Sequence, residues 1–150
     1  TQKKLGVKFI MTELKAFDTN ILIYAFDIDE KVKHERAKKL FNSVCNGEIK
    51  GLLSIQNLTE LFYWFVRSKK VSIDLSEKII NDFINSKQWI IKDLDINRLK
   101  LGINLTKQTK MHFWDALICA NAILEGVKEI YTENVTHYRS DLIKAINPLI

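Results

Sequence analysis

The chain has 150 residues, of which 47% are apolar and 27% are charged, so one globular domain with a real core is expected and disorder is excluded. Its net charge of +5 and pI near 9.1 favour a polyanionic partner such as nucleic acid, although a solvated basic surface without a partner is the alternative. No apolar run is long enough for a membrane span and the amino end lacks a secretory signal pattern, so a cytoplasmic protein is expected.

Apolar runs of strand length alternate with helical patterns along the chain, which predicts a central, mostly parallel sheet covered by helices. Residues 1–10 precede Met11 and are interpreted as a leader or tag-like extension, which leaves 11–150 as a single domain. The predicted strands are 14–17, 51–55, 89–91, 127–131 and an edge strand at 147–150. The predicted helices are 19–26, 32–45, 56–68, 72–86, 95–108 and 113–125.

Asp18 stands between the first predicted strand and the first predicted helix. Ligands of open α/β sheets bind beyond the carboxyl ends of the strands, so Asp18 is a candidate corner of an acidic metal site. An Asp at such a junction is also often a simple helix N-cap, and this residue alone leaves both interpretations open. Thr19 and Asn20 follow it, and their side chains can orient a carboxylate or a metal-bound water.

Glu60 lies on a predicted helix that is apolar nearly all round, where a carboxylate costs stability unless something pairs with it. By three- and four-residue spacing it shares one face with four residues, so that face is predicted to line a cleft. The alternative is a surface ion pair between Glu60 and Arg67, two turns away. The residues on this face besides Glu60 are Gln56, Tyr63, Trp64 and Arg67.

Two further groups of oxygen ligands follow in the second half of the chain. Asp115 lies in the first turn of a predicted helix. The helix dipole keeps a carboxylate at this place ionised, as a metal ligand must be. The alternative is that Asp115 only complements the dipole. Thr132, Glu133 and Asn134 come directly after the strand predicted at 127–131. Asn134 is neutral and offers one oxygen, which predicts weaker metal binding at that corner unless Glu133 compensates.

Three short motifs, in this order, carry a resemblance to a known family. They are Asp18-Thr19-Asn20-Ile21-Leu22, Gln56-Asn57-Leu58-Thr59-Glu60-Leu61 and Phe113-Trp114-Asp115-Ala116-Leu117-Ile118, joined by Lys33-His34-Glu35-Arg36-Ala37. With these motifs the chain resembles PIN-domain nucleases, and among them the VapC-type toxins of toxin–antitoxin pairs. The resemblance implies a three-layer α/β/α fold with a central parallel sheet and a Mg²⁺- or Mn²⁺-dependent endoribonuclease. It also implies a cognate antitoxin and a homodimer.

Carried over to this chain, the resemblance implies that Asp18, Glu60 and Asp115 are the catalytic metal ligands. It places Asn134 at a fourth position, where the family usually has an Asp, with Glu133 beside it. Thr19, Asn20 and Thr132 would then support the ligands. The oxygen ligands agree with this on chemical grounds, because hard donors select Mg²⁺ or Mn²⁺ over zinc. Candidate phosphate contacts on or next to the acid-bearing helices are Arg67, Lys69, Lys70, Lys107 and Lys110.

Two other classes of protein remain open from the sequence. A non-catalytic PIN-fold regulatory domain would bind RNA or protein without cutting, and the neutral Asn134 favours it. A phosphotransfer enzyme, either a receiver domain or an aspartyl phosphatase, also places an Asp after the first strand of a parallel sheet. The phosphatase pattern needs a second Asp two residues on, where this chain has Asn20.

Overall fold

The computed structural model describes residues 12–150, so the predicted leader or tag-like extension at 1–10 lies outside the described residues. Within them, five parallel strands form one sheet in the order β3-β2-β1-β4-β5. The strands are β1 (Leu14–Phe17), β2 (Lys50–Ser54), β3 (Trp89–Lys92), β4 (Glu129–Tyr131) and β5 (Lys144–Ile146). The chain first moves outward from β1 to β3 and then returns to the other side of β1, so the strand order reverses between β1 and β4.

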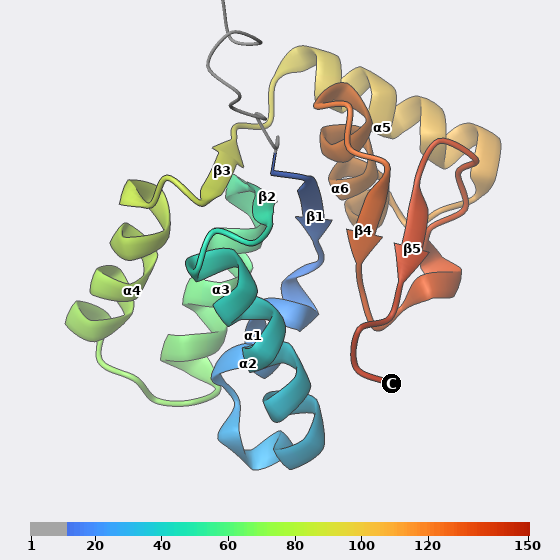
Figure 1. Ribbon diagram of the computed structural model, residues 1–150. Helices are drawn as coiled ribbons and strands as arrows, with labels where there is room; N and C mark the ends of the chain where they lie inside the picture. The colour runs from blue at the N-terminus through green and yellow to red at the C-terminus, as the bar shows by residue number, and fades with distance from the viewer. Residues whose placement is uncertain (1–11) are drawn as a thin grey trace, which may run out of the picture.

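Helices cover both faces of this sheet, which confirms the predicted three-layer α/β/α fold (Figure 1). Helices α1 to α4 pack on one face, and α5 and α6 pack on the other. Across the described residues, no helix is both long enough and apolar enough to pass through a membrane. The helices are α1 (Thr19–Phe26), α2 (Lys31–Cys45), α3 (Ile55–Arg67), α4 (Ile73–Asn85), α5 (Ile96–Thr109) and α6 (Phe113–Leu124), with short 3₁₀ turns at η2 (Ile28–Glu30) and η3 (Val135–His137).

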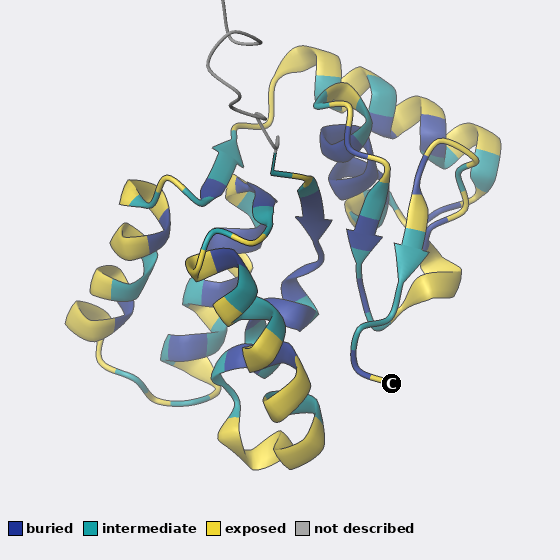
Figure 2. Cartoon of the chain, viewed as in Figure 1, coloured by how far each residue is buried: buried dark blue, intermediate teal, exposed yellow. Residues whose placement is uncertain are grey.

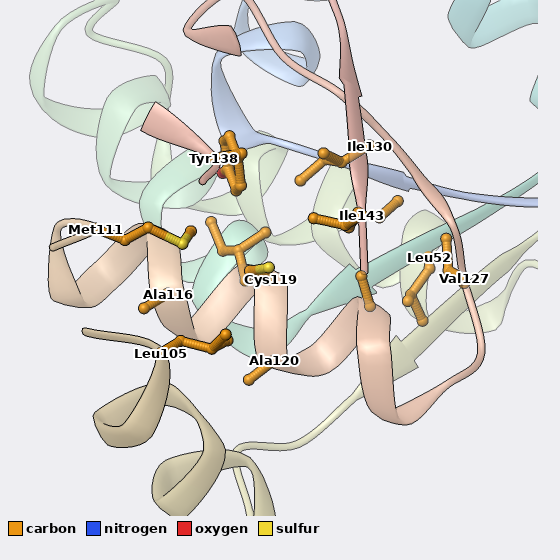
Figure 3. Packing of buried hydrophobic residues seen from close by; sticks show 13 residues of the cluster. Leu52, Leu105, Met111, Ala116, Cys119, Ala120, Val127, Ile130, Tyr138 and Ile143 are labelled. Atoms are coloured by element: carbon orange, nitrogen blue, oxygen red, sulfur yellow. The ribbon is translucent and has the colours of Figure 1, made fainter. Parts of the chain in front are cut away.

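The two hydrophobic cores follow from the alternation of side chains along each strand. Ala16 and Leu52 face α5 and α6, whereas their neighbours Phe17 and Leu53 face α1 to α4. Figure 2 shows β1 and β2 mostly buried, whereas the outer faces of the helices are exposed. Helix α6 is buried nearly all round because it lies between the sheet and α5, and Figure 3 shows the small residues that allow this close packing, such as Ala116 and Ala120.

The predicted edge strand at 147–150 is wrong, because β5 lies at Lys144–Ile146. Its ladder begins where the Lys144 N–H donates to the Lys128 carbonyl oxygen and ends where the Thr132 N–H donates to the Ile146 carbonyl oxygen. Pro148 has no N–H for such a ladder, and the buried Leu149 packs into the core formed with α1 to α4. The other predicted elements agree closely with the observed ones, the largest shift being that of β4, predicted at 127–131.

Gly51 is required where β2 meets β3. It pairs with Trp89, whose indole ring lies across the space that a side chain at Gly51 would occupy. A Cβ at this position would stand 2.3 Å from two carbons of that ring. Trp89 is only 4% exposed and packs against Phe17 and Phe83, so the ring cannot move aside freely.

We therefore expect Gly51→Ala to lower the free energy of unfolding by about 1–3 kcal/mol through overpacking. Urea denaturation followed by circular dichroism measures this loss. In a Trp89→Phe background the same change should cost less, because the smaller ring leaves space for the added methyl group. An equal cost in both backgrounds would show that the contact between Gly51 and Trp89 is not the cause.

Candidate active site

Asp18 lies at the carboxyl end of β1, at the point where the strand order reverses. Its side chain is the N-cap of α1, because Oδ1 accepts a hydrogen bond of 2.7 Å from the Thr19 backbone N–H. Its other oxygen, Oδ2, accepts one of 2.8 Å from the Thr132 hydroxyl, which follows β4. The cap is therefore present, and it also holds the carboxylate at the place where α/β sheets bind ligands.

The surroundings of Asp18 disfavour a lone negative charge. The residue is 8% exposed, and burial raises the pKa of its carboxyl above the ordinary value. The nearby charge of Asp115 raises this pKa further, while the hydrogen bond from Thr132 opposes the shift. The carboxylate at the β1–α1 junction thus has a second carboxylate, from α6, near it, and its hydrogen bonds do not fully offset burial and this charge.

Tyr138 closes this region from the segment after β4. Its ring packs in the cluster over α6 with Cys119 (Figure 3), and its buried hydroxyl lies against Asp18 without a hydrogen bond of regular geometry among the described residues. Burial raises the pKa of the phenol, and the negative charges of Asp18 and Asp115 raise it further, so the hydroxyl keeps its proton. A buried hydroxyl without a well-formed hydrogen bond is a group that a bound ligand can pair.

Asn57 fixes the start of α3 against the β1–α1 junction. Its side chain and Ser54 form a capping box, and its Nδ2 donates to the Thr19 hydroxyl oxygen at 2.9 Å and to the Phe17 carbonyl oxygen at 3.3 Å. Sequence reasoning missed this role. The Ser54-x-x-Asn57 spacing at a helix start was the available signal.

Asp115 lies in the first turn of α6, at the side of a polar cleft of about 510 Å³. Asn134 and His137 line the same cleft, and His137 Nδ1 lies 3.2 Å from Asp115 Oδ2. The sequence analysis did not single out His137 or Tyr138. Their distance of a few residues from the Thr132–Asn134 turn was the only signal for them.

Glu60 lies on the rim of a neighbouring cavity of about 670 Å³ that Trp114 also lines. Its carboxylate accepts a 2.9 Å hydrogen bond from Gln56 Nε2, which also reaches the Trp114 carbonyl oxygen at 3.5 Å. Across the described residues it forms no ion pair with Arg67, so that alternative is not realised. Within residues 12–150, no three carboxylate, imidazole or thiol side chains converge closely enough to hold a metal ion by themselves.

Glu133 and Asn134 point to different surroundings. Glu133 accepts a 2.7 Å hydrogen bond from the Tyr24 hydroxyl and pairs with Lys33 Nζ at 2.5 Å, and Lys33 is the main cause of its lowered pKa. Asn20 supports the turn by accepting a 3.4 Å hydrogen bond from the Glu133 backbone N–H. Asn134 instead faces the cleft beside Asp115. Both oxygens of Glu133 are thus engaged by α1 and α2.

The candidate phosphate contacts fall into two groups. Arg67, Lys69 and Lys70 lie at the carboxyl end of α3, about two turns from Glu60. Lys69 is engaged there by Asp27 and by Asp29, each at 2.6 Å. Lys107 lies in the last turn of α5, and Lys110, which follows it, lines the cleft beside Asp115.

A known family matches this chain over a range that includes all the candidate metal ligands. The family model of the PIN domain matches residues 15–141. The chain belongs to the PIN domain family. This assignment confirms the resemblance seen in the sequence motifs and removes the receiver and aspartyl phosphatase alternatives.

Solved structures similar to this PIN domain are toxin–antitoxin complexes. A complex from Klebsiella pneumoniae has a TM-score of 0.67 and 18% identity, covering 89% of this chain and 97% of that chain. VapBC2 from Rickettsia felis, bound to a promoter DNA fragment, has a TM-score of 0.60 and 22% identity over 89% of this chain and 98% of that chain. DNA-bound VapBC from Salmonella typhimurium has a TM-score of 0.63 and 20% identity, covering 92% of this chain and 99% of that chain. No curated protein matches the sequence.

Proposed function

We propose that this PIN domain is a Mg²⁺- or Mn²⁺-dependent endoribonuclease and the toxin of a cytoplasmic toxin–antitoxin pair. The observation that carries the proposal is the pairing of Asp18 and Asp115 at the reversal of strand order, beside a polar cleft. A buried carboxylate such as that of Asp18, with the charge of the half-buried Asp115 near it, is costly without a counter-charge, and a divalent cation supplies one.

The residues present fit a hard divalent cation. Asp18 and Asp115 supply carboxylate oxygens, which are the hard donors that Mg²⁺ and Mn²⁺ prefer. Asp18 and Asp115 would hold the ion, with Glu60 and Asn134 at the edges of the two adjoining cavities as further oxygen donors. Phosphate oxygens of the substrate complete such a site, which explains why the protein groups alone do not close around it.

The remaining polar residues have supporting tasks in this proposal. A bound Mg²⁺ or Mn²⁺ ion activates water and offsets the negative charge that develops on the phosphodiester. Thr19 and Thr132 hold both oxygens of Asp18 in place, so that the carboxylate does not reorganise during the reaction. The N-terminal turn of α6 places Asp115 near Asp18. The buried Tyr138 hydroxyl would donate to Asp18 or to an oxygen bound beside it.

Exposed apolar residues support the proposed protein partners, a cognate antitoxin and a second copy of the chain. Ile55, Leu94 and Trp114 surround the 670 Å³ cavity and are 43%, 53% and 55% exposed. Apolar surface gathered in this way is typical of protein interfaces. The similar structures are complexes with antitoxins, which supports the antitoxin partner. A monomer in light scattering at working concentration would exclude the homodimer.

The proposed function is tested by incubating purified protein, free of any antitoxin, with mixed total RNA in the presence of Mn²⁺, Mg²⁺ or EDTA. We expect cleavage with either metal and none with EDTA. Absence of cleavage with every metal in folded protein would favour the alternative, a non-catalytic PIN-fold domain that binds RNA or protein. Asn134 is the residue that favours this alternative, and Asn134→Asp would then be the variant to examine for restored activity.

A further inference from the structure

The cleft beside Asp115 is built by two segments that are distant in sequence. Lys110 and His112 come from the connection between α5 and α6, and His137 and Arg139 come from the segment after β4. Asp115 lies between these two segments. The volume of about 510 Å³ is within the usual range for ligand sites, roughly 300–1,000 Å³.

Some lysines around the sheet are paired with carboxylates, and within residues 12–150 the two cations of this cleft are not. Lys15, Lys33 and Lys69 are each engaged by carboxylates at 2.5–2.7 Å. In contrast, Lys110 and Arg139 form no ion pair with any carboxylate among the described residues. Two uncompensated cations therefore line the same cleft as Asp115.

Both cations lie at defined positions beside the cleft. Lys110 adopts a left-handed conformation, with φ of 62°, at the carboxyl end of α5, where a non-glycine residue is uncommon. Arg139 is exposed, and its Nε donates a 3.2 Å hydrogen bond to the Thr136 carbonyl oxygen. That contact orients the guanidinium and leaves its terminal nitrogens available for a phosphate, which Arg binds in a bidentate manner.

We infer that this cleft is the subsite that holds the backbone of a single RNA strand, with Lys110 and Arg139 contacting phosphates on either side of it. The inference rests on the proposed function and adds the path that the strand takes to the carboxylates. His112 and His137 contribute polar edges to the same path. Arg67, Lys69 and Lys70, at the far end of α3, would not contact the strand within this subsite.

The test compares Lys110→Asn/Arg139→Gln with Lys38→Gln/Lys39→Gln, which removes two exposed positive charges from α2, away from the cleft. Asn tolerates the left-handed conformation at position 110, and Gln retains much of the arginine side chain. Binding of a labelled single-stranded RNA is measured by fluorescence anisotropy in EDTA at several salt concentrations. We expect the cleft variant to bind roughly tenfold more weakly than the wild type. The slope of log binding constant against log salt concentration should fall in magnitude by about 0.7 for each lost phosphate contact. The α2 variant should bind as the wild type does.

Cleavage in Mg²⁺ separates this inference from the proposed function. We expect the cleft variant to raise KM and leave kcat nearly unchanged, because phosphate contacts made by Lys110 and Arg139 position the strand in ground and transition states alike. If the wild-type protein cuts RNA but the cleft variant has the same RNA affinity and KM as the α2 variant, the proposed subsite is wrong. The proposed nuclease function is not affected by that result. Wild-type protein that neither binds nor cuts RNA would overturn the proposed function itself.

Discussion

Asp115→Asn is expected to abolish RNA cleavage while leaving the fold intact. The substitution keeps the shape of the side chain in the first turn of α6 but removes the charge that would hold the metal ion with Asp18. Loss of a supporting residue at a metal site already costs about 10–100-fold, so loss of a charged ligand should cost at least about 100-fold in cleavage rate. Initial rates on total RNA with Mn²⁺ and with Mg²⁺ measure the effect.

Asp74→Asn is the matched control for this variant. Asp74 also lies in the first turn of a helix, α4, but it is exposed and lies outside the candidate active site. The Asp74→Asn variant should cleave RNA at the wild-type rate. The comparison separates the loss of a metal ligand from the loss of a charge at a helix N-terminus. Activity close to wild type in Asp115→Asn itself would remove the metal-site proposal.

The sequence predicted the sheet, and the place of Asp18 at its carboxyl edge, because these depend on local patterns. Short apolar runs that alternate with amphipathic helices are enough to indicate a parallel sheet, and acidic residues at strand ends then lie on one edge of it. Asp18 shows both the strength and the limit of this reasoning. Its N-cap role and its place at the switch point follow from the strand–helix junction, but its raised pKa depends on burial and on Asp115, which lies on a distant helix.

The features that could not be predicted depend on contacts between distant segments. Glu133 was a plausible extra ligand by spacing, yet Tyr24 and Lys33, about a hundred positions earlier, engage both its oxygens. Nothing local to Tyr138 indicates that its hydroxyl is buried against Asp18. The edge strand was misplaced because Leu149 and Ile150 are apolar, and the pattern does not say which apolar residue enters the core.

Asp18→Asn is expected to abolish cleavage and, in metal-free protein, to raise thermal stability at neutral pH. Burial raises the pKa of Asp18 in the folded state above the value of 3.8 that it has when exposed. The folded protein therefore binds this proton more tightly than the unfolded chain does, and stability falls as the pH rises from 3.8 through the raised pKa. Above that pKa the full penalty applies to the wild type, whereas asparagine carries no charge and avoids it.

Thermal unfolding in EDTA at pH 4 and at pH 7 measures this difference, and the advantage of Asp18→Asn should shrink at the lower pH. Added Mg²⁺ or Mn²⁺ should reverse the order at pH 7, since an ion that binds only the folded wild type stabilises it and has no effect on the variant. Asn20→Asp, which adds a carboxylate at the neighbouring position, should instead lower the stability of the metal-free protein. The Asp18→Asn variant could instead be less stable than the wild type at pH 7 in EDTA, or be stabilised equally by the metal. Either result would mean that Asp18 stabilises the fold as a helix cap and does not bind the metal ion.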